Sequence, residues 1–381
     1  LAIPSIFTSI NYILRVGVFL GVAPTPSVSK LHKLYVLLLL VVSIPLFLTS
    51  SYLKMSIKTG IVALIEITSD FFLTLATSSM GLYIIFIHPS KLGQVFIHIK
   101  YFDGKMSFPF EERTKLYVLS FVLHSSCHLL FSALEIWKYY QYDVLHISNY
   151  LIHTQRILRV FQKNVFMFLW LLLAIEMYKR FKFLNNSLLR IVQDSCRAAT
   201  SPMNVYRVEK CETKHYPIKQ LRKISEMHNH LCELLDEINQ IFGIPILFYV
   251  LFSIMYIVYN TTFAIQEVFL ESEKEVQLKG SSNYFSLCYI IFAFVEVICL
   301  SAAGDYVSGE AKRIKDICQN ILVSLNIYDP SKVELMQLAQ QVAYRNPQLA
   351  ASSFFEIDFT ILGFTLANIT SYIIVAVQFL K

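Results

Sequence analysis

Charged residues are scarce in this 381-residue sequence: they make up 16% of it, against about 25% in an ordinary soluble domain. Hydrophobic residues make up 55%, and the mean hydropathy is +0.52. Aromatic residues are plentiful, with 30 Phe and 22 Tyr, which suits membrane interfaces and pockets for flat organic molecules. This balance argues against a soluble globular protein and indicates a protein dissolved in lipid.

Motifs for redox, metal and enzyme chemistry are also lacking. The seven cysteines include no CxxC pair, which argues against a disulfide framework and against a cysteine zinc site. The sequence shows no glycine-rich phosphate loop and no nucleophile paired with a base, so we expect no enzyme activity, no metal and no cofactor. A signal peptide is not expected, because no charged n-region precedes a short apolar stretch with a cleavage site.

Long apolar runs dominate what is present. A helix needs about 20 apolar residues to cross a bilayer, and seven segments meet this requirement. The sequence therefore predicts an all-α membrane protein with seven transmembrane helices. The predicted spans are Tyr35–Tyr52, Ile61–Ile87, Lys115–Trp137, Val160–Met177, Ile241–Leu270, Asn283–Gly304 and Phe359–Leu380.

The basic residues predict the orientation of these helices, because cytoplasmic loops carry an excess of Lys and Arg. With a cytoplasmic N-terminus, 24 of the 33 basic residues fall inside and nine outside, the nine including Lys54, Arg159 and Lys163. We therefore expect the N-terminus in the cytoplasm and the C-terminus outside the cell. This placement also accounts for the net charge of +6, so no nucleic-acid partner is expected.

Two polar stretches show helical periodicity outside the predicted spans. Apolar residues recur at helical spacing in 221–240, which predicts a cytoplasmic helix that continues into the fifth span. The residues after the sixth span repeat the pattern, and Val333–Arg345 forms a further predicted helix after Pro330. Such helices can form a platform that packs subunits together, or they can be solvated connectors.

The last predicted helix carries a recognisable motif. Tyr372, five apolar residues, Gln378 and Phe379 resemble the C-terminal T-Y-x5-Q-F hallmark of insect gustatory receptors, with Ser371 in place of the usual Thr. Two upstream segments also resemble that family. They are Phe354–Asp358, and His230–Glu233 together with Asn239–Gly243 before the fifth span.

This resemblance implies a tetramer around a central pore lined by the seventh helix. Val375 and Phe379 match apolar gate positions of the family, and Gln378 matches a polar residue that faces the pore. The spacing agrees, because positions i, i+3 and i+4 share one helical face. The alternative for Gln378 is a plain contact with water at the outer helix end.

The resemblance also implies one domain over residues 1–381 that is a ligand-gated, non-selective cation channel. Its parts would be a cytoplasmic N-terminal segment (1–34), four transmembrane helices (35–177), a cytoplasmic loop and helix (178–240), two further transmembrane helices (241–304), cytoplasmic anchor helices (305–358) and the pore helix (359–381).

Ionisable groups inside predicted spans are candidate sites, because they are costly in lipid. Asp70 lies four residues after Glu66 in the second span, and His128 lies four after His124 in the third. At about 1.5 Å per residue, Asp70 and His128 lie at the same depth, about 14 Å below the outer edge. They could pair or line one aqueous cavity. A zinc site from these residues and simple packing between helices are the alternatives.

The family's ligand pocket lies among the outer halves of the second to sixth helices, where this sequence has aromatic and amide side chains. An aromatic box of this kind suits a small organic molecule, although aromatic stripes also serve ordinary packing. Besides Asp70 and His128, the predicted ligand-binding residues are Trp170, Tyr256, Asn260, Phe263, Gln266 and Tyr289.

The functional prediction is a gustatory receptor opened by a small-molecule tastant, with a bitter or plant compound favoured over a sugar. We expect it in the plasma membrane of gustatory neuron dendrites, as a homotetramer or a heteromer with related receptors that conducts cations. The alternatives are a metabotropic receptor, an odorant-receptor-type channel subunit and a multipass transporter. The predicted topology is opposite to that of a G-protein-coupled receptor, and a transporter's repeated halves are not apparent.

Overall fold

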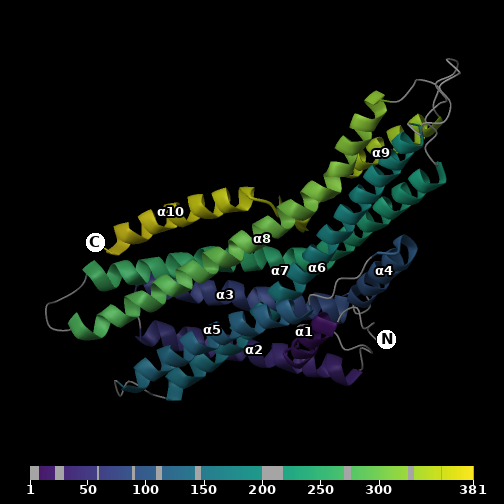
Figure 1. Ribbon diagram of the computed structural model, residues 1–381. Coiled ribbons are helices and arrows are strands. Elements are labelled where there is room, and N and C mark those ends of the chain that lie inside the picture. The colour runs from purple at the N-terminus through teal and green to yellow at the C-terminus, as the bar shows by residue number, and fades with distance from the viewer. Residues whose placement is uncertain are drawn as a thin grey trace, which may run out of the picture.

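The computed structural model describes residues 8–21, 30–57, 60–87, 91–108, 114–141, 147–199, 218–269, 276–324, 330–352 and 354–380. These residues are almost all helical, which confirms the predicted all-α fold class (Figure 1). The elements are α1 (Thr8–Phe19), α2 (Lys30–Ile57), α3 (Ile61–Leu82), the π-helical turn η2 (Tyr83–Ile87), α4 (Lys91–Met106), α5 (Thr114–Gln141), α6 (Ile147–Ala199), α7 (Ile218–Phe269), α8 (Val276–Ser324), α9 (Pro330–Arg345), β1 (Ala350–Ala351), β2 (Phe355–Glu356) and α10 (Thr360–Leu380).

Apolar helices occupy the places of all seven predicted spans. Five of them contain segments that are long and apolar enough to cross a membrane, and two more contain shorter apolar segments. The long segments are Lys30–Met55, Ile61–Leu82, Arg156–Ile191, Ile218–Gln266 and Ser286–Val323, and the shorter ones are Leu119–Leu134 and Thr360–Val375. The pattern of apolar runs was therefore sufficient to locate these helices.

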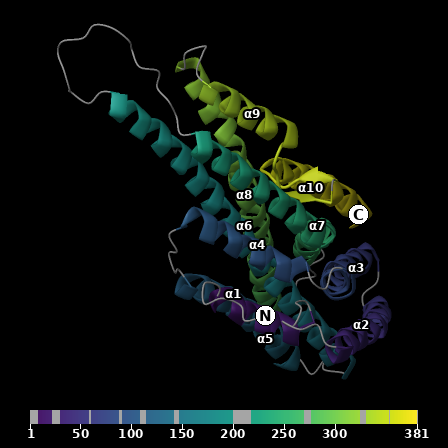
Figure 2. The ribbon, with the colours of Figure 1, turned by 90° about the vertical axis from the view of Figure 1, so that its right-hand side faces the viewer.

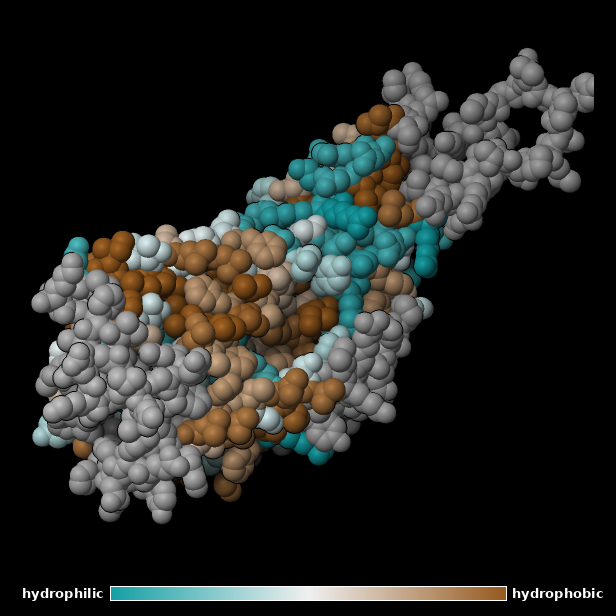
Figure 3. Space-filling model, turned by 60° about the vertical axis from the view of Figure 1, so that its left-hand side comes forward, coloured by the Kyte–Doolittle hydropathy of each residue, from teal (hydrophilic) through white to brown (hydrophobic). Residues whose placement is uncertain are grey.

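Three helices continue far beyond the spans predicted from the sequence. α6, α7 and α8 contain 53, 52 and 49 residues, and they project from one end of the bundle, where α9 packs on α7 and α8 (Figure 1). The helix predicted at 221–240 is confirmed as the first part of α7, and its apolar face is buried, as at Leu221 and Ile224. Hydrophobic side chains gather over the bundle and hydrophilic ones over the projecting end (Figure 3).

Four elements were not expected from the sequence. These are the short helices α1 and α4 and the strands β1 and β2. The strands and α1 are too short to give a strong periodic signal, and α4 follows the second predicted span in a stretch that was predicted as a loop. α1 packs against α5 and α6, while α4 packs against α7.

A small hairpin connects α9 to α10 and crosses the two long helices closely. β1 and β2 pair antiparallel, with Ala351 opposite Phe355. Glycines on the long helices make room for this segment: a Cβ on Gly304 would lie 1.9 Å from the Ile357 carbonyl oxygen, and one on Gly243 would lie 2.5 Å from the Ser352 amide nitrogen. The hairpin thereby fixes the start of α10 against α7 and α8.

α10 lies at the side of the bundle and packs on α7, α8 and α3 (Figure 2). Ile361, Thr365 and Ile369 form its buried face at i, i+4 and i+8. The opposite face stays uncovered within one chain, with Phe364 at 55% and Val375 at 46% exposed.

Lys54, Arg159 and Lys163, which were counted among the nine outer basic residues, do not lie in exposed loops. All three lie in helices and are 4% exposed. Long apolar stems let basic residues enter a helix bundle, where Lys54 and Lys163 pair with acids and Arg159 donates to Thr77 and Gln162.

Candidate functional site

Four helices bring polar groups together around one buried carboxylate, Glu296 of α8. Lys163 of α6 donates to both of its oxygens, at 2.7 and 2.8 Å, and the Tyr249 hydroxyl of α7 donates at 2.6 Å. Two histidines of α5 complete the group: His124 Nε2 lies 3.1 Å and His128 Nε2 lies 3.5 Å from Glu296 Oε1. We call these five residues the Glu296 cluster.

The charges of the cluster balance within the bundle. Lys163 and Glu296 are 4% and 9% exposed at their side chains, so neither charge is well solvated by water. A buried charge is tolerated when it is paired and hydrogen-bonded, and here one ammonium neutralises one carboxylate. The ammonium also lies 6.0 Å from the ring centre of Tyr249 and 5.9 Å from that of Phe252, close enough for cation–π attraction.

A cavity of about 20 Å³ adjoins this cluster between α5, α6, α7 and α8. Its wall combines cluster members with aromatic side chains of α7 and α8, and an arginine borders it. The lining residues are His128, Ser132, Arg156, Ile157, Val160, Lys163, Phe252, Tyr256 and Tyr289. The volume suits roughly one water molecule, so a larger ligand must move helices or side chains to enter.

Aromatic rings form one face of the cavity. Tyr256 stacks on Phe252 with ring centres 5.2 Å apart, and it meets Tyr289 edge-on at 6.0 Å. The Arg156 guanidinium lies 5.5 Å from the Tyr256 ring centre. Three of the predicted ligand-binding residues, His128, Tyr256 and Tyr289, therefore meet at one site.

The other predicted ligand-binding residues do not line this cavity. Trp170 is 1% exposed and belongs to the hydrophobic core. Asn260 is buried and donates to the Tyr256 carbonyl oxygen at 2.8 Å, one helical turn back. Phe263 packs on Tyr259 with ring centres 6.0 Å apart, and Gln266 is half-buried farther along α7.

Asp70 and His128 do not form the pair that their depth suggested. The Asp70 carboxylate instead binds the buried Lys54 of α2, which also lies 3.0 Å from Glu66. Helical spacing predicts the depth of each side chain but not which helix lies beside it, and α3 packs against α2. Lys54 thus pairs with both acids that had no partner in the sequence-based prediction, and its single positive charge offsets one of their two negative charges.

The sequence analysis also missed the central ion pair. Glu296 stands in the middle of the sixth predicted span, but its partner Lys163 lies near the boundary of the fourth, where it was counted as an outer charge. A signal did exist: one acid and one base within apolar segments are expected to pair, because lipid penalises both when they are separate.

The cluster contains a donor set that resembles a metal site. One ligand atom each from His124, His128 and Glu296 lies within 4.8 Å of the others. However, the Lys163 ammonium binds both oxygens of the only carboxylate in this set, and a divalent cation there would be repelled by it. The geometry therefore fits an ion-pair network better than a metal centre.

The predicted pore residues lie on or near the uncovered face of α10. Val375 is 46% exposed, Tyr372 is 48% exposed and Gln378 is exposed, while the side chain of Phe379 lies outside the described residues. Ser371 donates to the Ala367 carbonyl oxygen at 2.9 Å, so its hydroxyl is satisfied within the helix.

Comparison with known proteins places these features in context. A profile described as the 7tm chemosensory receptor family matches residues 10–380. Putative gustatory receptor 28a of Drosophila melanogaster is 22% identical over 182 residues, which are 47% of this chain and 40% of that protein. Putative gustatory receptor 28b of the same species is 22% identical over 166 residues, which are 43% of this chain and 35% of that protein. The matches thus span about two fifths of the length of these relatives.

The fold resembles solved insect receptors along its whole length. The olfactory receptor OR5 of Machilis hrabei in complex with eugenol superimposes with a TM-score of 0.65 at 12% identity, covering 98% of this chain and 100% of that one. The structure of the same receptor described without eugenol gives a TM-score of 0.63 at 11% identity, with the same coverage of both chains.

Proposed function

Because this chain belongs to the 7tm chemosensory receptor family, of the insect gustatory and olfactory type, we propose that it is a gustatory-type receptor and ligand-gated cation channel. A small organic tastant, with a bitter or plant compound favoured over a sugar, would open it at the plasma membrane of gustatory neurons. Its working form would be a homotetramer or a heteromer with related receptors.

The observation that carries this proposal is the aromatic cavity beside the Glu296 cluster. Tyr256 and Tyr289 offer flat apolar surfaces, while Arg156 and His128 offer polar contacts, a combination typical of pockets for small organic ligands. The Machilis hrabei receptor of the same fold has been solved with eugenol, an aromatic ligand. Eugenol is therefore a reasonable first probe.

The small volume of the cavity suggests how binding can drive opening. A ligand larger than about one water must separate the helices that line a 20 Å³ cavity, so it binds the expanded arrangement better than the closed one. Such differential affinity is what shifts a two-state equilibrium. Binding that favours the open state by a few kcal/mol shifts the population substantially.

Helix α7 connects the cavity to the proposed pore helix. Phe252 and Tyr256 of α7 line the cavity, and the same helix packs against α10 and meets the hairpin at Gly243. A tilt of α7 would therefore move α10 directly.

The uncovered face of α10 supports assembly around an axis. Apolar side chains such as Phe364 and Val375 are exposed there together with Gln378. In a tetramer, four such faces could surround one pathway, where apolar rings gate by dewetting and amides ligate a partly hydrated cation. The projecting part of α8, together with α9 and the hairpin, would form the cytoplasmic anchor at 305–358. The first part of α7 would be the cytoplasmic helix beside it.

The direct test is recording from outside-out patches without nucleotides, after surface expression is confirmed, with eugenol, bitter compounds and sugars applied in turn. We expect agonist-evoked unitary cation currents. Tyr256→Ala should raise the half-maximal agonist concentration at least tenfold and leave unitary conductance unchanged. Gln378→Ala should change conductance or ion selectivity with little change in agonist sensitivity.

Ile298→Ala is the matched control, because Ile298 is an apolar residue of α8 near the cluster but is 45% exposed on the outside of the bundle. It should behave as the unsubstituted protein does. Currents that require GTP, or conductance that is insensitive to every substitution on the uncovered face of α10, would contradict the proposal and favour the metabotropic alternative.

A further inference from the structure

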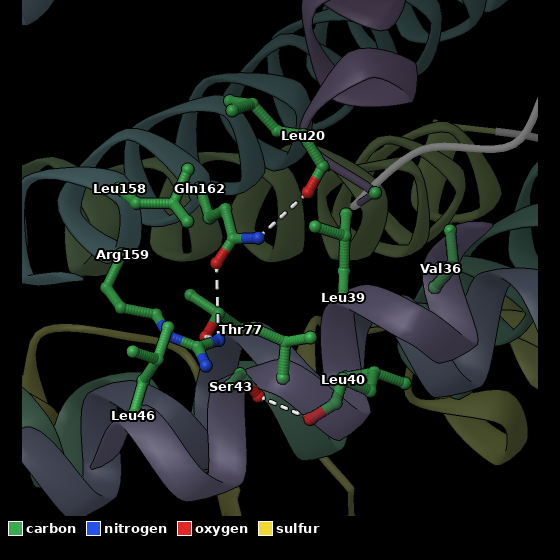
Figure 4. Close-up of a pocket in the computed structure, with 12 residues that line it drawn as sticks. Leu20, Val36, Leu39, Leu40, Ser43, Leu46, Thr77, Leu158, Arg159 and Gln162 are labelled. Carbon is green, nitrogen blue, oxygen red and sulfur yellow. Dashed lines mark hydrogen bonds between the residues drawn. The ribbon is translucent and has the colours of Figure 1, made fainter. Parts of the chain in front are cut away.

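A second cavity, of about 50 Å³, lies between α2, α3 and α6, beside the carbonyl end of α1 (Figure 4). It does not share a lining residue with the aromatic cavity. Most of its wall is aliphatic, and its polar groups come from four side chains. The lining residues are Leu20, Gly21, Val36, Leu39, Leu40, Val42, Ser43, Leu46, Thr77, Leu158, Arg159 and Gln162.

Arg159 is the only charged residue in this lining. Its side chain is 4% exposed and lies within the membrane-capable part of α6. One terminal nitrogen, Nη1, donates to Thr77 Oγ1 at 2.9 Å and to Gln162 Oε1 at 3.3 Å. The other, Nη2, is buried and has no hydrogen-bond partner among the described residues.

The missing counter-charge distinguishes Arg159 from the other buried basic residues. Lys54 is paired with Glu66 and Asp70, Lys163 with Glu296, and Arg180 with Asp103 and Glu176. Within the described part of the chain, Arg159 forms no ion pair with any carboxylate. A buried guanidinium without an anion is strongly unfavourable in a lipid-surrounded site.

The polar groups next to Arg159 already take part in other hydrogen bonds, which leaves its Nη2 without an acceptor among the described residues. Gln162 Nε2 donates to the Leu20 carbonyl oxygen at 2.8 Å, which turns its Oε1 towards Arg159. The Ser43 hydroxyl donates to the Leu40 carbonyl oxygen at 2.7 Å. Arg159 thus lines the cavity (Figure 4) and keeps at Nη2 a buried donor that no described residue uses, which a small movement of the side chain would offer to an incoming group.

The cavity opens towards the outside of the bundle. Two lining residues, Val42 of α2 and Leu158 of α6, are 46% and 39% exposed. In a membrane this surface faces acyl chains. A ligand that enters here must carry an anionic group small enough for the cavity and an apolar part that tolerates the aliphatic wall.

We propose that this cavity binds the carboxylate of a long-chain fatty acid that enters from the surrounding lipid. The guanidinium of Arg159 holds the carboxylate through Nη2, a charge-assisted hydrogen bond of the kind that arginine forms best. The acyl chain leaves past Val42 and Leu158 along the leucines of α2. The volume corresponds to roughly three or four water molecules, which accommodates a carboxylate but not a phospholipid headgroup.

The test is equilibrium binding of radiolabelled oleate to the purified full-length chain in detergent micelles. We expect saturable binding that unlabelled oleate displaces and that methyl oleate, which lacks the negative charge, displaces at least tenfold less well. Arg159→Gln should weaken oleate binding at least tenfold, and Arg159→Lys should weaken it less. Lys100→Gln, which removes an exposed positive charge on α4, is the matched control and should bind as the unsubstituted protein does.

A second variant keeps the test independent of folding defects at Arg159. Leu46→Trp fills the cavity from α2 and leaves Arg159 in place, and it should reduce oleate binding by a similar factor. The proposal is overturned if Arg159→Gln binds oleate normally, or if methyl oleate competes as well as oleate does. It is also overturned if millimolar acetate or chloride displaces oleate completely, because that result would identify a small-anion site.

Discussion

Burial changes the energetic role of a single charged side chain, and Lys163 illustrates this at the residue scale. The same ammonium on a surface helix would contribute a few tenths of a kcal/mol to stability through a salt bridge. Here it lies 2.7 Å from a carboxylate and is 4% exposed, so loss of either partner leaves an isolated charge within the bundle. Replacing both partners with apolar residues leaves no isolated charge in the bundle.

Removing one partner of this pair should therefore be worse than removing both. We expect Lys163→Met to destabilise the protein by about 3–5 kcal/mol, because Glu296 would stay buried without its counter-charge. The double variant with Lys163→Met and Glu296→Met should recover a large part of this loss. Thermal unfolding of the detergent-solubilised protein, followed by size-exclusion chromatography, measures the difference. A double variant less stable than either single one would show that the pair itself is strongly stabilising.

At the scale of elements, small residues decide how closely the hairpin between α9 and α10 approaches the long helices. Asn239 of α7 clamps this segment: its side chain donates to the Gln348 carbonyl oxygen at 2.9 Å and accepts from the Ala350 amide at 3.0 Å. Gly304 of α8 faces the Ile357 carbonyl. The sequence segment Asn239–Gly243, which resembled the gustatory receptor family, thus has a structural role at this crossing.

Gly304→Ala should disrupt this crossing, because the new methyl group would lie 1.9 Å from a backbone oxygen that cannot move away without shifting the hairpin. We expect a loss of several kcal/mol in stability and impaired agonist-evoked current. Gly309→Ala on the same helix is the matched control, since no atom lies within 4 Å of its Cβ position. There the change should be neutral or stabilising by up to about 1 kcal/mol. Equal behaviour of the two variants would refute this account of the hairpin.

For the whole molecule, the distribution of charge and the projecting helices predict one orientation in the membrane. Figure 3 shows hydrophilic side chains over the end where α6, α7 and α8 project, and the basic excess of the sequence lies in the same segments. Under the positive-inside rule this end faces the cytoplasm. α10 runs back towards the opposite end of the bundle (Figure 1).

This orientation predicts that the C-terminus is extracellular. An epitope tag after Lys381 should be labelled by antibody on intact cells, whereas a tag before Leu1 should be labelled only after permeabilisation. The opposite result would place the projecting helices outside the cell. It would contradict both the orientation and the proposed cytoplasmic anchor, and it would restore the metabotropic alternative.

The sequence by itself determined the fold class, the positions of the apolar helices and the continuity of the helix predicted at 221–240 with the fifth predicted span. These features depend on local periodicity and on the length of apolar runs, which a single chain displays directly. The C-terminal motif around Tyr372 and Gln378 also pointed to the correct family. His128, Tyr256 and Tyr289 were also among the predicted ligand-binding residues, and these three line one cavity.

Only the tertiary structure decided which of these side chains meet. Helical spacing predicts the depth of a residue and the face of the helix that carries it, but not which helix packs against that face. Asp70 therefore pairs with Lys54 and not with His128. The same limit concealed the pairing of Lys163 with Glu296 and the unpaired nitrogen of Arg159. The packing of α2, α5, α6 and α8, which are far apart in the sequence, brings these groups together. This packing cannot be predicted from the residue pattern of any one segment.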